Sequence, residues 1–153
     1  MEVPMSDYDS DILVWSEHQA NLLRRLAAGE TINDQVDFEN IAEEIEALGR
    51  SDRRELRSRI ATILLHLIKL QASPSTEPRA GWHETLFEQR AGIRAVLQDS
   101  PSLRPMVPVM IMEELPEVRE RALVSLRDYG EHPSVDIVDL TYDEDEVLGS
   151  WLP

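Results

Sequence analysis

Apolar residues recur every three or four positions over most of the first 130 residues, the spacing that places them on one face of an α-helix. The first such segment runs from the capping residues at 7–10 to a glycine stop at Gly29. Its apolar stripe consists of Ile12, Trp15, Leu22, Leu23 and Leu26. We predict a first amphipathic helix over residues 10–29 that packs this stripe on a core.

Two further helices are predicted in the next 45 residues. One begins at Asp37 and ends at Gly49, and Ser51 then starts another that runs to about residue 73. The stripe of the earlier helix, which we expect to face the core, consists of Phe38, Ile41, Ile45 and Leu48. The later helix is apolar nearly all round over residues 63–70, so it should be covered on several sides and form the centre of the fold.

The remaining chain predicts two more helices and a tail. A polar loop precedes a helix over residues 82–98, and a last long helix follows over 106–130. Because a proline inside a helix costs about 3 kcal/mol, the prolines at 105, 108 and 116 should kink this helix or split it in two. The tail contains at most a short helix near residues 143–149.

These elements together predict an all-α fold. Short connections between successive helices imply antiparallel neighbours, hence an antiparallel helical bundle of about five helices with a short irregular C-terminal tail. A chain of 153 residues is the size of one domain. We therefore expect a single helical domain over residues 1–153, with a flexible N-terminus (1–9), a bundle (10–130) and a tail packed along it (131–153).

Charge narrows the classes of partner. The net charge is −15, and the first 50 residues hold twelve acidic and three basic side chains. Such a field repels nucleic acid and anionic lipid, so we predict no nucleic-acid or membrane partner and favour a basic protein, with a second copy of the chain as an alternative. The chain has no cysteine, no segment long and apolar enough to span a membrane and no signal-peptide pattern, which together suggest a cytoplasmic protein.

Several blocks of the sequence resemble a known family. IAEEIEALGRSDRREL (41–56) is followed in order by LLHLIKLQ (64–71), GWHETLFEQRAGI (81–93) and DSPSL (99–103). With YDSDILVWSEHQANLLR near the start and YDEDEVLGSWLP at the end, they resemble the bacterial domain of unknown function 29 family. The resemblance implies a compact, all-helical cytoplasmic bacterial protein. The resemblance carries no established activity, substrate or catalytic residue.

The glutamates of the first block are candidate chemistry. Glu39, Glu43 and Glu46 share one helix face opposite the apolar stripe, whereas Glu44 lies about 80° from the stripe centre, at a half-buried position. If the chain turns at Gly49, the arginines that follow it would pair with these glutamates across the turn. Exposed pairs of this kind contribute only about 0–1 kcal/mol each.

A metal site is the second reading of this region, with Glu44, His66 and His18 as its candidate ligands. None of the four histidines has Glu or Asp three positions earlier, and no His-Glu-x-x-His occurs, so the di-iron and zincin templates fail. His18, Glu44 and His66 would meet at one seam if the first three helices pack together, with His83 nearby. The structural alternative is a hydrogen bond between His66 and Glu44 that orients one helix on the next.

Two features remain outside these readings. Arg90 is expected to pair with a half-buried glutamate or to receive a carboxylate or phosphate ligand, while Trp82 anchors its loop on the bundle. The Met-rich stretch 106–112 suits either the core or a partner interface. No serine lies in a nucleophile motif and no cofactor is predicted. We therefore predict a non-enzymatic interaction module, with a metal-binding or enzymatic bundle as the alternative.

Overall fold

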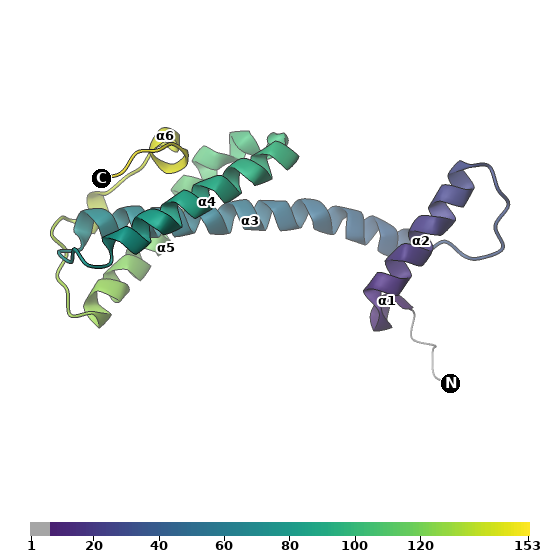
Figure 1. Ribbon diagram of the computed structural model, residues 1–153, viewed down its shortest axis with the longest axis horizontal. Coiled ribbons are helices and arrows are strands. Elements are labelled where there is room, and N and C mark those ends of the chain that lie inside the picture. Colours follow the sequence, from purple (N-terminus) through teal and green to yellow (C-terminus); the bar gives the residue numbers. More distant parts are fainter. Residues whose placement is uncertain (1–6) are drawn as a thin grey trace. The chain divides into compact units, whose positions relative to one another are not determined.

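The computed structural model of the protein describes residues 7–153, and helices make up most of them (Figure 1). In chain order they are α1 (Asp7–Ser10), α2 (Ile12–Ala27), α3 (Phe38–Ala72), α4 (Arg79–Asp99), the 3-10 helix η1 (Pro101–Met106), α5 (Val107–Asp128), the 3-10 helix η2 (Ile137–Asp139) and α6 (Glu144–Leu148). No strand occurs in this part of the chain. The prediction of an all-α fold is confirmed.

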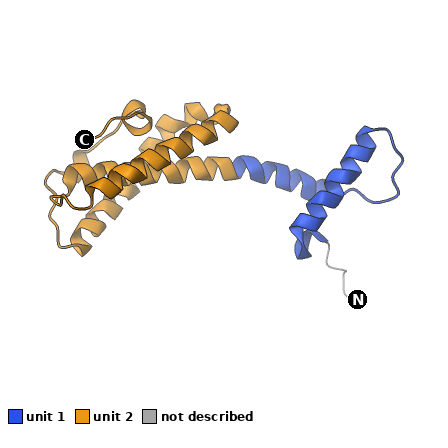
Figure 2. Cartoon of the chain, viewed as in Figure 1, with its two compact units in different colours: residues 1–50 blue, residues 51–153 orange. Residues whose placement is uncertain are grey.

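The chain divides into two compact units, residues 1–50 and residues 51–153, which we call the N-terminal and C-terminal units (Figure 2). Helix α3 begins in the first and ends in the second. Of the N-terminus that was predicted to be flexible, residues 1–6 lie outside the described residues and residues 7–9 belong to α1.

The C-terminal unit contains a large hydrophobic core. The near-continuous apolar run of α3 lies at its centre, as predicted, and α4 and α5 pack on it with their buried leucine, isoleucine and valine side chains. The tail contributes Ile137, Tyr142 and Val147 to the same core. The short helix predicted near residues 143–149 is present as α6, which begins with a capping box formed by Asp143 and Glu146.

The predicted break at Gly49 is wrong, because α3 continues through it to Ala72. The two glycines with a positive φ among the described residues, Gly29 (80°) and Gly130 (69°), directly follow the C-cap residues of α2 and α5. Gly49 is not among them and is exposed. A helical glycine costs only about 1 kcal/mol relative to alanine, and the good helix formers on both sides of this one outweigh that cost.

A substitution at Gly49 tests the continuity of α3. Gly49→Ala is expected to raise stability by roughly 0.5–1 kcal/mol, because the position is helical and a new Cβ would meet no atom within 4 Å. Thermal unfolding followed by circular dichroism measures the change. Gly130→Ala is the control and should destabilise, since its backbone is left-handed. Destabilisation by Gly49→Ala would show that the chain turns there.

The apolar stripe predicted for residues 37–49 does not face a core. Phe38, Ile45 and Leu48 are 64%, 64% and 71% exposed. The cause is the continuity of α3: residues 51–72 extend the same helix, so they cannot fold back as an antiparallel neighbour over this stripe. Helix α2 crosses the first turns of α3 instead of lying alongside them, so it covers little of the stripe (Figure 1).

The predicted glutamate–arginine pairs across a turn are therefore also wrong. Arg50 pairs with Glu43 (2.7 Å) and Glu46 (3.5 Å) of its own helix. Arg57 donates to Glu113 (2.8 Å) and Glu114 (2.7 Å) of α5 and so ties two helices of the C-terminal unit together.

The prolines do not split the last long helix, which runs unbroken as α5 from Val107 to Asp128. η1 ends at Met106 and α5 begins at Val107, so Pro105 lies in the 3-10 segment and Pro108 in the first turn of α5, where a missing N–H costs little. Pro116 lies inside α5 and is exposed.

Candidate protein-interaction surface

Trp15 is the centre of the N-terminal unit. Its side chain is 6% exposed, and its Nε1–H donates to a carboxylate oxygen of Asp37 at 3.2 Å. The ring of Tyr8 meets it edge to face, with ring centroids 4.9 Å apart. The indole thus joins α1 and α2 to the start of α3.

Asp37 organises the crossing of the two helices. Its backbone N–H donates to the side-chain oxygen of Gln19 (2.9 Å), and its carboxylate caps α3 by accepting from the backbone N–H (3.3 Å) and side-chain amide (2.8 Å) of Asn40. The hydrogen bond from the Asn40 side chain is the main cause of the lowered pKa of Asp37. Gln19 is buried, and its hydrogen bond with Asp37 fixes the angle between α2 and α3.

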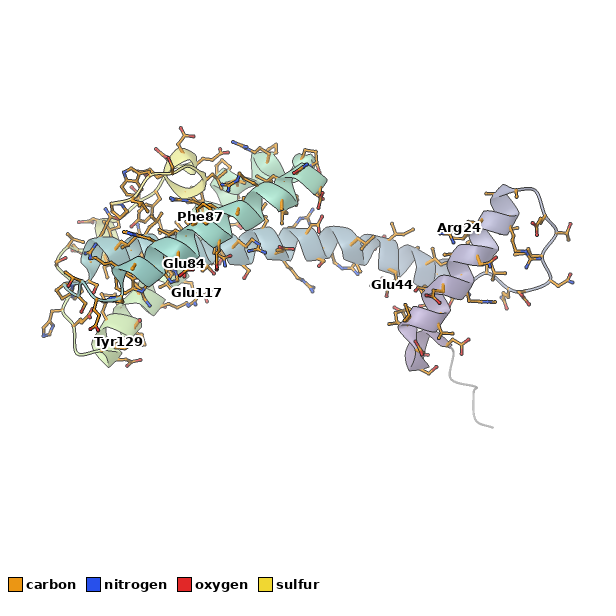
Figure 3. The ribbon with its side chains drawn as sticks, in the orientation of Figure 1. Arg24, Glu44, Glu84, Phe87, Glu117 and Tyr129 are labelled. Carbon is orange, nitrogen blue, oxygen red and sulfur yellow. The ribbon has the colours of Figure 1, made fainter. Side chains whose placement is uncertain are left out.

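Glu44 is half-buried, as predicted, and projects from α3 beside α2 (Figure 3). Its partner is Tyr8, whose hydroxyl donates to Glu44 Oε1 at 2.7 Å. Because the carboxylate accepts a hydrogen bond from the protonated phenol, this contact raises the pKa of Tyr8. Tyr8 therefore connects the first helical turn to both Trp15 and Glu44.

A groove of about 300 Å³ lies between α2 and α3. We call it the α2–α3 groove; it is lined by Trp15, Ser16, Gln19, Ala20, Leu23, Ile41, Glu44, Ile45 and Leu48. Further apolar side chains are exposed on the same two helices, among them Ile12, Leu26 and Phe38. Surface apolar residues scattered singly are ordinary, but exposed apolar residues that line one groove, as Leu23, Ile45 and Leu48 do, are typical of a binding site.

The groove lies in a strongly negative unit. Residues 1–50 carry a net charge of −9, and two of their three arginines are engaged with glutamates: Arg25 with Glu30 (2.8 Å) and Arg50 with Glu43 and Glu46. Arg24 is the exposed third (Figure 3). Glu44 makes no ion pair with any residue of the described part, 7–153.

His66 lies in the C-terminal unit and has a partner of its own. Its Nδ1 is 2.8 Å from the carbonyl oxygen of Thr62, so Nδ1 carries the proton and donates, and Nε2 is unprotonated in the neutral ring. Burial lowers the pKa of His66 below its ordinary value of 6.5. The charged imidazolium is therefore disfavoured in the folded protein.

This lowered pKa predicts a pH dependence of stability. The unfolded chain binds a proton at His66 more readily than the folded one, so the contribution of His66 is complete above pH 6.5 and is lost as the pH falls below it. Urea unfolding at pH 7.5 and pH 5.5 should show the wild type losing more stability on acidification than His66→Gln. An equal loss in both proteins would contradict the assignment.

The three candidate metal ligands lie in separate environments. Glu44 belongs to the N-terminal unit and His66 to the C-terminal unit, each with the partners described. His18 is exposed and lines a pocket of about 560 Å³ with Asp37 and Glu39. Residues 7–153 contain no group of three or more His, Asp or Glu side chains arranged to hold a metal ion. The metal site stays a prediction, which elemental analysis of untagged protein would test.

Arg90 does not pair with a half-buried glutamate. The buried guanidinium donates to three backbone carbonyl oxygens of the tail, those of Glu146 (2.7 Å), Val147 (3.0 Å) and Trp151 (2.8 Å). Two of these residues lie at the end of α6, whose last carbonyls need donors from elsewhere. Arg90 thus holds the tail on α4. Trp82 is half-buried and packs against the core of this unit, as expected for an anchor.

The Met-rich stretch divides between core and surface. Met110 is buried in the core of the C-terminal unit, and Met106 packs partly against it. Met112 is exposed. The stretch is therefore mainly a core segment at the start of α5.

The groove itself was not predicted. Its residues were visible as apolar stripes, but each stripe was assigned to a core. Predicting one continuous helix through Gly49 would have shown that these apolar residues face solvent, because it removes the helix that was expected to cover residues 38–48.

No helix within residues 7–153 has the length and apolar character needed to cross a membrane.

Comparisons with known proteins show the family to which the chain belongs. A search of curated proteins found no match to this chain, and a search of solved structures also found none. The family model described as Domain of unknown function DUF29 matches residues 8–138, from α1 to η2. The chain therefore belongs to the DUF29 family, as its sequence blocks suggested.

Proposed function

We propose that the protein is a non-enzymatic interaction module that binds a protein partner through the α2–α3 groove. The observation that supports this is the exposure of Ile45 and Leu48, which line the groove together with Trp15. Fully burying a leucine or isoleucine side chain contributes roughly 1.5–3 kcal/mol, so leaving both in water is costly unless a partner covers them. The hydrogen bonds of Asp37 hold the two helices that form the groove, so its shape exists before binding.

The chemistry of the groove favours a binding role over catalysis. Glu44 is the one titratable group among the lining residues, and its carboxylate already accepts a hydrogen bond from Tyr8. The lining residues thus contain no nucleophile with an adjacent base. An apolar lining with a few polar groups is suited to the side chains of another protein.

The test compares partner binding by wild type and by an Ile45→Gln/Leu48→Gln variant. Proteins captured from cell extract are identified by mass spectrometry, and each is then purified and titrated against both forms. Because each substitution removes an apolar contact worth at least about 1.4 kcal/mol, the double variant should bind at least about a hundredfold more weakly. Both side chains are exposed, so its folding should be unchanged.

Met112→Gln is the matched control, because Met112 is an equally exposed apolar residue of the C-terminal unit. It should bind like the wild type. A partner whose affinity falls with Met112→Gln and not with the groove variant would refute the groove as the binding surface.

A further inference from the structure

We infer that the occupant of the α2–α3 groove is a basic amphipathic α-helix of a partner protein. This inference rests on the proposed function and adds the chemistry of the partner. Three observations support it: the charge of the N-terminal unit, the environment of Glu44, and the dimensions and backbone structure of the groove.

The charge of the N-terminal unit selects a cationic partner. Its net charge is −9, and the arginines at 25 and 50 are neutralised within the unit. A second copy would bring an equal negative charge to the same surface, and the two fields would repel each other. A cationic segment would be attracted and would associate faster, with a rate that falls as salt is added.

Glu44 provides a specific contact for such a segment. It is the one charged side chain that lines the groove, and it makes no ion pair with any residue of 7–153. One of its oxygens accepts from Tyr8, and a carboxylate offers about four acceptor sites. A lysine or arginine at the edge of the bound segment would supply the missing cation, and half-burial makes such a charge-assisted bond stronger than one on an open surface.

The lining of the groove spans about two turns of each of its two helices. Its lining runs from Trp15 to Leu23 on α2 and from Ile41 to Leu48 on α3, which are about 12 Å and 10 Å long at 1.5 Å per residue. An amphipathic helix covers that length with apolar residues at i, i+3 or i+4, and i+7. Binding by β-strand addition would need a sheet edge, and the described residues of this unit contain no strand.

Three synthetic 18-residue peptides test the inference. They share one apolar face of leucine and alanine and carry lysine, glutamine or glutamate on the polar face. Each is titrated into full-length ¹⁵N-labelled protein at 50 and 300 mM NaCl, with the Trp15 indole N–H and the amides of α2 and α3 as reporters. The lysine peptide should bind at least tenfold more tightly than the glutamate peptide at low salt, and this difference should shrink at high salt.

Two variants separate the contact at Glu44 from the general charge. Glu44→Gln should weaken the lysine peptide severalfold and leave the glutamine peptide unchanged. Glu39→Gln removes the same charge from an exposed position on α3 that does not line the groove, so it should have a much smaller effect. Equal effects of the two variants would overturn the role of Glu44.

Other outcomes are distinguishable. Equal binding of all three peptides, with loss in Leu48→Gln, would overturn the basic partner and retain the groove as a binding site. A dimer in sedimentation that Leu48→Gln dissociates would make a second copy the occupant and overturn the inference. Peptide shifts confined to residues outside 7–50 would overturn it too. The proposed function itself is decided separately, by the Ile45→Gln/Leu48→Gln variant and its partner.

Discussion

Replacing Arg90 by methionine is expected to destabilise the C-terminal unit by about 3 kcal/mol. The guanidinium makes three hydrogen bonds to tail carbonyls, and a bond to a charged group contributes roughly 1.5–3 kcal/mol. Methionine fills a similar space but leaves the carbonyl oxygens of Glu146, Val147 and Trp151 without this donor. Urea unfolding followed by far-ultraviolet circular dichroism measures the loss, and hydrogen exchange should show the tail losing protection first.

Two control variants test whether the planar, forked guanidinium of Arg90 is required. Arg94→Met changes an exposed arginine on the same helix and should alter stability by less than about 0.5 kcal/mol. Arg90→Lys keeps the charge, but a single ammonium cannot reproduce the planar fork, so it should lose most of the same stability. An Arg90→Met protein within about 1 kcal/mol of wild type would show that the tail is held by its apolar residues alone.

The core of the C-terminal unit could be predicted from sequence because its signals are local. Residues 63–70 are apolar on nearly every face, and such a segment is stable only when several neighbours cover it. The structure buries Ile63, Leu64, Leu67, Ile68 and Leu70. The helix ends predicted at Gly29 and Gly130 were also correct, because each of these glycines adopts the left-handed backbone that ends a helix.

Gly49 shows why the same reasoning failed for residues 37–50. A glycine shortly before a serine is a common stop and start signal, but it determines the backbone only when the alternative helix is unfavourable. Here the residues on both sides favour the helix, and Arg50 bonds Glu43 and Glu46 along it. One wrong turn then misplaced everything that depended on it: the antiparallel neighbour, the arginine pairs and the burial of Ile45 and Leu48.

The candidate site was predicted in part for a related reason. A helical wheel places Glu44 at a half-buried position without further information, and the structure agrees. Its partner could not be predicted, because Tyr8 lies 36 residues away and reaches it through the crossing of α2 over α3. Arg90 is a similar case, since its three acceptors lie 56 to 61 residues further along the chain. The periodicity of a helix shows on which helix face a residue lies, but it does not show which residues that face contacts.

Replacing Trp15 by alanine is expected to unfold α1 and α2 while the C-terminal unit stays folded. Trp15 and Leu22 are the two buried apolar side chains of the described residues 7–50, so a small unit depends on few contacts. Removing a buried tryptophan costs about 3–5 kcal/mol, which exceeds what so small a core supplies. The Asp37 and Tyr8 contacts are lost with it. Hydrogen exchange by mass spectrometry should show α2 amides exchanging at least a hundredfold faster.

The C-terminal unit is the internal control for Trp15→Ala, because it has a hydrophobic core of its own. The other buried apolar residues among 7–153 lie in residues 51–153, so the amides of α4 and α5 should keep their wild-type protection in Trp15→Ala. Trp15→Phe retains an aromatic ring but loses the bond to Asp37, and should cost only about 1 kcal/mol. If Trp15→Ala lowered protection equally in both units, they would form one cooperative domain. If α2 alone opened, partner binding through the α2–α3 groove should vanish without loss of the C-terminal unit.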